Sequence, residues 1–285
     1  KLLNEVEKFK FIISYLNEAK RYVADTALKS DIETSIDRLG EIIVKGDAQR
    51  KQYMQELEQL KARYADYYLS AYVAAHLPAT EETLLTSIKN MPERQVAETV
   101  AQAVQADANL SIISLYEYDS WIQKFNGVRI ASPTVTKQTI MQTPFQNFNP
   151  VSEGGKPQPN LKELKQEIAV IHAGMEEQIK AALEDPMAQQ NKQMLSQQEA
   201  ILFDEFVSGN VSLSAQYVHP LLTVLKKLST NFNVVELTMD NFKSRFNRPL
   251  DIDSARNALS ALIEDIINEQ RRQGKKYEDI RIIIK

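Results

Sequence analysis

Apolar residues near the start of the chain recur at alternating steps of four and three positions. They are Leu2, Val6, Phe9, Ile13 and Leu16, and Val23 follows seven positions later. This spacing predicts one face of an α-helix that packs along a neighbour. Ser30 and Glu33 form a capping-box pattern, so we expect a break or kink there before helix continues through Ile36, Leu39 and Ile43.

A second long amphipathic helix is predicted after Gly46 and Asp47, which supply a stop and a new start. Its apolar positions are Tyr53, Leu57, Leu60, Tyr64 and Tyr67. A short turn between two long helices favours an antiparallel hairpin with coiled-coil-like spacing, with Leu60 and Tyr64 buried against the first helix. The charged residues between these positions, Lys61 among them, are expected on the exposed side.

Prolines divide the next part of the chain into shorter helices. Pro78 ends the long helix, and Thr80-Glu81-Glu82 opens a brief one. Pro92 suits the first position of the following helix, where its missing N–H leaves no bond unmade. Residues 93–106 and 110–125 are therefore predicted as two helices that close an N-terminal bundle.

The pattern changes between about residues 130 and 160. Five prolines stand in this segment, at positions 133, 144, 150, 157 and 159. A helix does not continue through prolines at this density, so the segment is either a linker or an extended arm. Ile140, Met141, Phe145 and Phe148 favour an arm that packs on the protein over a free tether, because disordered segments carry few apolar residues.

Helical periodicity resumes over residues 161–183. Ser196 and Glu199 form a second capping box before an apolar helix, and Gly209 stands where a helix-terminating glycine belongs. Residues 214–229 are predicted as a further helix.

The C-terminal part combines helices with two strand signals. Residues 234–237 and 280–284 are rich in β-branched side chains, and we expect the two segments to pair in a small sheet. Between them, Thr238 caps a brief helix, and either Asp251 or Asp253 begins the last long helix.

These elements predict a mainly α protein of two helical lobes. The N-terminal lobe is a helical hairpin or bundle over residues 1–129, and the C-terminal lobe, residues 161–285, carries the small β element. An extended proline-rich arm, residues 130–160, joins them. With 285 residues, of which 43% are hydrophobic, the chain is long enough for two cores.

Charge and cysteine content limit the class of protein. A formal net charge of -4 argues against attraction of nucleic acid or anionic lipid by the whole surface. No cysteine is present, which suits the cytoplasm, and no apolar run reaches membrane-spanning length. The first residue is Lys1 instead of methionine, so we expect part of a longer protein whose upstream residues can carry an activity.

The candidate chemical motifs are each incomplete. Gly154-Gly155-Lys156 lacks the upstream glycine of a phosphate-binding loop, and Pro157 replaces the Ser or Thr that binds magnesium. His172 and Glu176 share a helical face in a geometry that suits a metal. No third ligand lies nearby in the sequence, so a solvated surface pair is the favoured interpretation. The sequence assigns no catalytic, cofactor-binding or metal-binding residue.

The remaining histidines and the aromatic clusters favour structural roles. His76 and His219 each lie close to a proline, and a packed or capping histidine is the simpler interpretation. The aromatic residues are Tyr64, Tyr67, Tyr68 and Tyr72, and then Tyr116, Tyr118, Trp121 and Phe125. At helical spacing such rings are usually core. A base-stacking platform needs cations between exposed rings, whereas the charges here are mixed.

The C-terminal part holds the best basic candidate surface. Its cations are Lys226, Lys227, Lys243, Arg245, Arg248, Arg271, Arg272, Lys275, Lys276 and Arg281. Acidic residues lie among them, which favours a solvated mixed-charge face over a nucleic-acid interface.

Several segments together carry a resemblance to a known family. They are Tyr72 to His76, Thr143-Pro144-Phe145 through Asn149-Pro150, Glu184-Asp185-Pro186 with Gln190-Asn191-Lys192, Phe203-Asp204-Glu205-Phe206, Val234-Val235-Glu236-Leu237-Thr238-Met239, and Asp279-Ile280-Arg281-Ile282-Ile283. In this order they resemble the C-terminal region of the large PglY/BrxC-type P-loop ATPases of bacterial phage-defence (BREX) systems. The resemblance implies a helical piece of an ATPase whose nucleotide site lies upstream of Lys1, and it transfers no catalytic or metal-binding residue onto this chain.

The resulting hypothesis is a non-catalytic scaffold or protein-interaction region of a phage-defence ATPase. Its expected partners are other domains of that ATPase and other defence proteins. The alternative is a nucleic-acid-binding module that uses the C-terminal basic face, and a third possibility is an enzyme site assembled from dispersed residues. A contiguous positive stripe would favour the second, and a deep pocket with perturbed carboxylates would favour the third.

Overall fold

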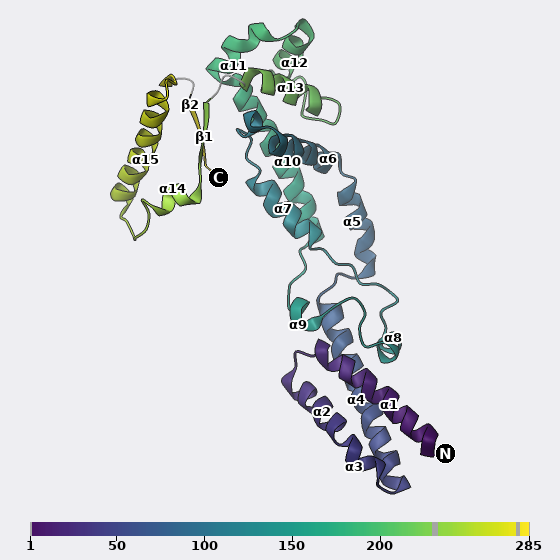
Figure 1. Ribbon diagram of the computed structural model, residues 1–285. Helices are drawn as coiled ribbons and strands as arrows, with labels where there is room; N and C mark the ends of the chain where they lie inside the picture. Colours follow the sequence, from purple (N-terminus) through teal and green to yellow (C-terminus); the bar gives the residue numbers. More distant parts are fainter. Residues whose placement is uncertain (1, 230–232, 278–279, 285) are drawn as a thin grey trace. The chain divides into compact units, whose positions relative to one another are not determined.

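The computed structural model describes residues 2–229, 233–277 and 280–284, and its fold is mainly α (Figure 1). The chain divides into two compact units. One unit combines residues up to 85 with residues 125–161, and the other combines residues 86–124 with residues from 162 onward. The sequence predicted an N-terminal bundle over residues 1–129, which contains residues 86–124, whereas the structure groups residues 86–124 with the second unit. These residues pack with the C-terminal part of the chain, and periodicity does not reveal such a partner.

The first unit is built on four helices: α1 (Leu2–Ala19), α2 (Thr26–Asp37), α3 (Leu39–Ile43) and α4 (Asp47–Ala74). Helices α1 and α2 both pack on α4, as their positions in Figure 1 show. Leu60 and Tyr64 lie buried in the shared core, and the Tyr64 ring meets the Tyr15 ring edge-on at 5.9 Å. Their predicted burial against the first helix is therefore confirmed.

The break in the first helical stretch lies earlier than predicted. After α1, one 3-10 turn (Lys20–Tyr22) leads to Asp25, whose carboxylate accepts hydrogen bonds from the N–H groups of Ala27 at 2.8 Å and Leu28 at 3.1 Å. Asp25 thereby caps α2, because it satisfies N–H groups that have no partner within the helix. The predicted break at Ser30 and Glu33 is wrong, since both residues lie inside α2.

Lys61 was expected to be exposed, but only 8% of its surface is accessible. Its ammonium group lies 4.8 Å from the centre of the Tyr15 ring and 5.6 Å from that of Phe11. The side chain crosses the α1–α4 interface, where the aliphatic stem is covered and the charge faces two aromatic rings.

Residues 130–160 form an ordered arm that packs on α4, as the apolar residues in it predicted. The arm contains two short helices, α8 (Lys137–Gln142) and α9 (Pro150–Glu153), and both contact α4 (Figure 1). Ile140 and Phe148 belong to the core of this unit and are fully buried. The prolines therefore prevent a long helix without producing a free linker.

Tyrosine hydroxyls bind the backbone of this arm. Tyr15 donates to the carbonyl of Ile140 at 2.6 Å, Tyr64 donates to that of Pro144, and Tyr68 donates to that of Phe148. The hydroxyl of Tyr72 accepts from the N–H of Ser132 at 2.9 Å. An irregular segment has no ladder partners for its polar groups, and these hydroxyls supply them.

The second unit contains α6 (Pro92–Ala106), α7 (Tyr116–Asn126), α10 (Leu161–Glu184), α11 (Pro186–Asn191), α12 (Gln197–Val207) and α13 (Val218–Ser229). Helix α5 (Glu82–Lys89) precedes them. Helix α13 packs on α6, α11 and α12, and most of its apolar side chains are buried. The predicted capping box of Ser196 and Glu199 is present at the start of α12.

The two predicted strands pair, as expected. β1 (Asn233–Leu237) and β2 (Ile280–Ile284) run parallel, with Val235 opposite Ile282. A parallel pair needs a long crossover, and α14 (Met239–Lys243) and α15 (Ile252–Arg272) provide it. Asp251 caps α15 by accepting from the N–H of Ser254 at 2.8 Å, which decides between the two predicted starts.

Candidate functional site

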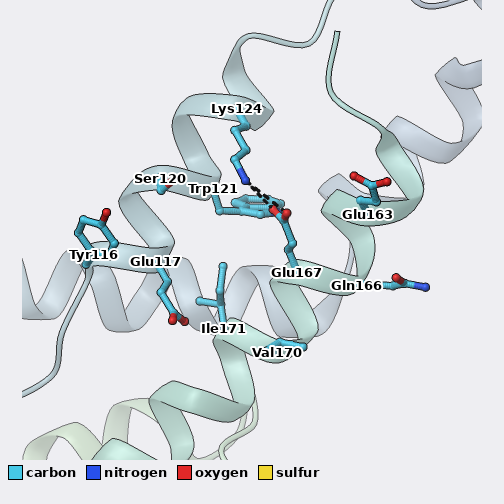
Figure 2. Close-up of a pocket in the computed structure, with 10 residues that line it drawn as sticks. All are labelled: Tyr116, Glu117, Ser120, Trp121, Lys124, Glu163, Gln166, Glu167, Val170 and Ile171. Atoms are coloured by element: carbon cyan, nitrogen blue, oxygen red, sulfur yellow. Dashed lines mark hydrogen bonds and ion pairs between the residues drawn. The ribbon is translucent and has the colours of Figure 1, made fainter. Parts of the chain in front are cut away.

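A groove of about 480 Å³ lies between α7 and α10 (Figure 2). Its lining residues are Tyr116, Glu117, Ser120, Trp121 and Lys124 of α7, with Glu163, Gln166, Glu167, Val170 and Ile171 of α10. On both helices these positions recur at helical spacing over about two turns. The groove therefore follows the two helix axes.

The two helices that form the groove run in opposite directions. The N–H of Ser114, just before α7, donates to the side chain of Gln178 at 2.6 Å, whereas Lys124 near the end of α7 contacts Glu167 at 3.2 Å. The indole N–H of Trp121 donates to the carbonyl of Leu164 at 2.9 Å, which anchors α7 on α10. The floor of the groove is therefore held in place by packing and by a buried hydrogen bond.

The groove combines an apolar surface with an acidic rim. Trp121 and Ile171 are buried at its base, whereas Tyr116 and Val170 are 81% and 67% exposed on its walls. Three glutamates and one lysine among the lining residues give a formal charge of -2. Large exposed apolar side chains with a polar rim are typical of protein-binding surfaces.

Tyr116 was predicted in the core, and the groove was therefore not expected from the sequence. The core prediction is confirmed for Tyr118, Trp121 and Phe125, which are all buried. These three share one helical face at steps of three and four. Tyr116 stands two positions before Tyr118, which turns it away from that face. This offset is the signal that distinguishes Tyr116 in the sequence.

His172 and Glu176 hold a loop together instead of forming a solvated pair. The Nε2 atom of His172 lies 2.7 Å from the carbonyl oxygen of Leu213, and a Glu176 carboxylate oxygen accepts from the N–H of Leu213 at 3.2 Å. Leu213 itself is buried in the loop between α12 and α13. The solvated interpretation was wrong because the loop that binds this pair lies far along the sequence.

The other two histidines also differ in their surroundings. His76 stacks on Tyr72 with ring centres 3.9 Å apart, and its Nδ1 atom lies 2.6 Å from the Tyr72 carbonyl oxygen. Burial lowers the pKa of His76, so the neutral ring is favoured. The prediction of a packed histidine is confirmed here. His219 is exposed in the first turn of α13.

The Gly154-Gly155-Lys156 segment ends a helix instead of beginning one. The N–H of Gly154 donates to the carbonyl of Pro150 at 3.0 Å, which closes the single turn of α9. Gly155 adopts a φ of 74°, and the next helix begins only at Leu161. A phosphate site needs backbone N–H groups that point at the ligand from a helix start, and this geometry does not supply them.

The C-terminal cations are mixed with carboxylates in space as well as in sequence. Six of them form ion pairs: Lys226 with Asp107, Lys227 with Glu199, Lys243 with Asp240, Arg245 with Asp265, Arg272 with Glu269, and Arg281 with Asp185. Nucleic-acid interfaces need a continuous positive field. The pairing therefore favours the mixed-charge interpretation.

Metal clusters and membrane-spanning helices are both absent from the described residues. Among them, no group of three or more His, Asp or Glu side chains is arranged to hold a metal ion. In the same part of the chain, no helix combines the length and the apolar character that crossing a bilayer requires.

Comparison with known protein families gives a match to the first quarter of the chain. A family described as "Family of unknown function (DUF6079) 5th domain" matches residues 1–72, which include α1, α2, α3 and most of α4. No curated protein and no solved structure gives a significant match. The match covers the hairpin helices and not the α7–α10 groove.

Proposed function

We propose that this chain is a non-catalytic protein-interaction region of a larger multidomain protein. The observation that carries the proposal is the α7–α10 groove, where Tyr116 and Val170 expose large apolar surfaces beside an acidic rim. Desolvation of such side chains by a partner is the main favourable term in protein association.

The description of the matching family supports the idea of a larger protein. A fifth domain implies at least four others in the proteins that define the family. The segments that resemble PglY/BrxC-type ATPases favour the same picture, in which the nucleotide site lies elsewhere in the protein. We therefore propose that the partner is another region of the same phage-defence ATPase, or another cytoplasmic defence protein.

A photo-crosslinker at Tyr116 in the full-length protein tests this proposal. Its matched control is the same crosslinker at Val44, because Val44 and Tyr116 are both 81% exposed. We expect crosslinks from position 116 to a defined segment of the same protein or of a defence partner, identified by mass spectrometry. Equal and scattered crosslinking from both positions would contradict the proposal.

The nucleic-acid alternative predicts a different result. Fluorescence anisotropy with a labelled DNA duplex would then show binding by this chain that weakens steeply with salt. The measurement also has an internal control, since Lys275→Glu and Lys276→Glu together would abolish such binding and leave the crosslinks from Tyr116 unchanged.

A further inference from the structure

We infer that the α7–α10 groove binds an amphipathic helix that carries lysine or arginine on both sides of its apolar stripe. The inference rests on the proposed function and specifies the chemistry of the partner. It follows from the direction of the groove, from the position of its apolar side chains and from the charge on its two walls.

The shape of the groove fits a helix. The lining positions extend from Tyr116 to Lys124 on α7 and from Glu163 to Ile171 on α10. Eight residue steps at about 1.5 Å each give a length of about 12 Å. A third helix that lies along this groove would complete a three-helix packing, in which its side chains enter the space between the two ridges.

The apolar side chains define how that helix would be oriented. Trp121 and Ile171 form the base, while Val170 lies beside Ile171 on α10 and Tyr116 lies at the start of α7 (Figure 2). A partner helix with apolar residues at positions i, i+4 and i+7 presents a stripe about as long as the groove. Burial of such a stripe against the exposed Tyr116 and Val170 would provide the affinity.

The charges define what flanks the stripe. Glu117 lies on the α7 wall, and Glu163 and Glu167 lie on the α10 wall (Figure 2). Lys124 is the one lysine among the lining residues, and it pairs with Glu167. The formal charge of the two walls together is therefore negative. A partner helix therefore meets carboxylates on both sides. Lysine or arginine at these flanking positions is attracted, whereas glutamate there is repelled.

The same charges disfavour an anionic lipid surface as the occupant. Membrane-bound surfaces usually combine exposed apolar side chains with lysine and arginine, because the lipid headgroups are negative. Here the exposed Tyr116 and Val170 stand beside glutamates. The surface is complementary to a cationic protein segment.

Selection from a displayed library of single helices tests the inference. The library fixes leucine at i, i+4 and i+7 and randomises the flanking positions among Lys, Arg, Glu, Gln and Ser. The target is the complete chain. A second selection uses the Val170→Asp variant, whose exposed position accepts the substitution without loss of folding, and circular dichroism checks that both proteins melt alike.

The expected result is enrichment of Lys and Arg on both flanks in helices that bind the native chain but not the Val170→Asp variant. Binding of these helices should weaken about tenfold in a Glu117→Lys variant, which corresponds to about 1.4 kcal/mol. It should be unchanged in a Glu58→Lys variant, because Glu58 is an exposed residue of α4 outside the groove.

Two other outcomes would overturn the inference in different ways. Helices that depend on Val170 but show no basic enrichment would contradict the charge preference and leave the groove as a protein-binding site. Failure to select any helix that depends on Val170 would contradict the inference that a helix occupies the groove. The proposed function would still be tested separately, by crosslinks from Tyr116 in the full-length protein.

Discussion

Single side chains decide how the first unit holds its irregular arm. The hydroxyls of Tyr15, Tyr64 and Tyr68 each reach a backbone carbonyl of the arm from a buried position. Burial raises the pKa of all three phenols. Lys61 adds a cation that packs beside the Tyr15 ring. The core of this unit is therefore mostly apolar, and it contains a few buried hydroxyl groups that bind the arm.

Replacement of Lys61 tests its unexpected burial. Lys61→Ala should lower the free energy of unfolding by about 1–2 kcal/mol, because the packed stem and the contact with two rings are both lost. Lys61→Met keeps most of the stem, so its smaller cost, about 0.5–1 kcal/mol, isolates the cation–ring contact. Urea unfolding measures both variants. If Lys61→Ala costs no more than Glu58→Ala at an exposed position of α4, the burial has no energetic importance.

Replacement of Tyr64 tests the bond to the arm and its dependence on pH. Tyr64→Phe should cost about 1–3 kcal/mol at neutral pH, because the Pro144 carbonyl loses its donor. The raised pKa of Tyr64 means that the unfolded chain releases the phenol proton first, above about pH 10. Native stability should then fall by about 1.4 kcal/mol per pH unit for this group.

Urea unfolding at about pH 7 and at several values above pH 10 measures this effect. The Tyr64→Phe variant lacks the titrating group, so its stability should fall less steeply over the alkaline range. Tyr116→Phe is the control for loss of a phenol hydroxyl, since Tyr116 is largely exposed and its replacement should leave the stability at about pH 7 unchanged. Parallel curves for native protein and Tyr64→Phe would contradict the assigned role.

At the level of elements, local signals and long-range pairing contribute differently. Asp25 and Asp251 begin their helices through bonds to the N–H groups of the first turn, which involve only neighbours in the sequence. Strands β1 and β2 instead pair across a crossover that contains α14 and α15. A strand has no partner for its backbone groups until the second strand arrives.

Removal of residues 280–285 tests this pairing. The truncated chain should lose hydrogen-exchange protection at the amides of β1, while amides of α4 in the other unit keep theirs. Arg281→Ala is the matched control, because it removes the ion pair with Asp185 but keeps the strand backbone. Unchanged protection in β1 after the truncation would show that β2 does not pair there.

At the level of the whole molecule, each unit joins segments that are distant in sequence. The first unit brings residues 125–161 onto α4, and the second combines residues 86–124 with the C-terminal part. The α7–α10 groove exists only because of the second grouping, since its walls come from both segments. Such a surface is suited to a protein partner. The glycine pair at residues 154–155, in the first unit, ends a helix instead of beginning one.

The isolated chain should therefore neither bind nor hydrolyse ATP. Nucleotide binding needs several backbone N–H groups and a lysine directed at the phosphates to offset the loss of their hydration. Calorimetric titration of the chain with ATP and Mg²⁺ should show no heat of binding. Micromolar affinity would contradict the prediction, and a Lys156→Ala variant would then show whether Gly154-Gly155-Lys156 is responsible.

The sequence by itself determined most helices, the ends marked by Pro92, Ser196 and Gly209, and the two strands. Periodicity and caps depend on residues a few positions apart, so these features can be inferred from local order. The burial of Leu60 and Tyr64 also followed from their place on a repeated apolar face. The α7–α10 groove was not predicted. Its two walls are about forty residues apart in the chain, and local periodicity does not show that they meet.

Only the tertiary structure decided which segments meet. Lys61 became buried because α1 places two rings beside it, and His172 and Glu176 bind Leu213 because a distant loop lies against α10. Residues 86–124 joined the C-terminal part for the same reason. The energy of these contacts depends on pairs that are remote in sequence, and a pattern of hydrophobic and polar positions specifies which face is buried without specifying its partner.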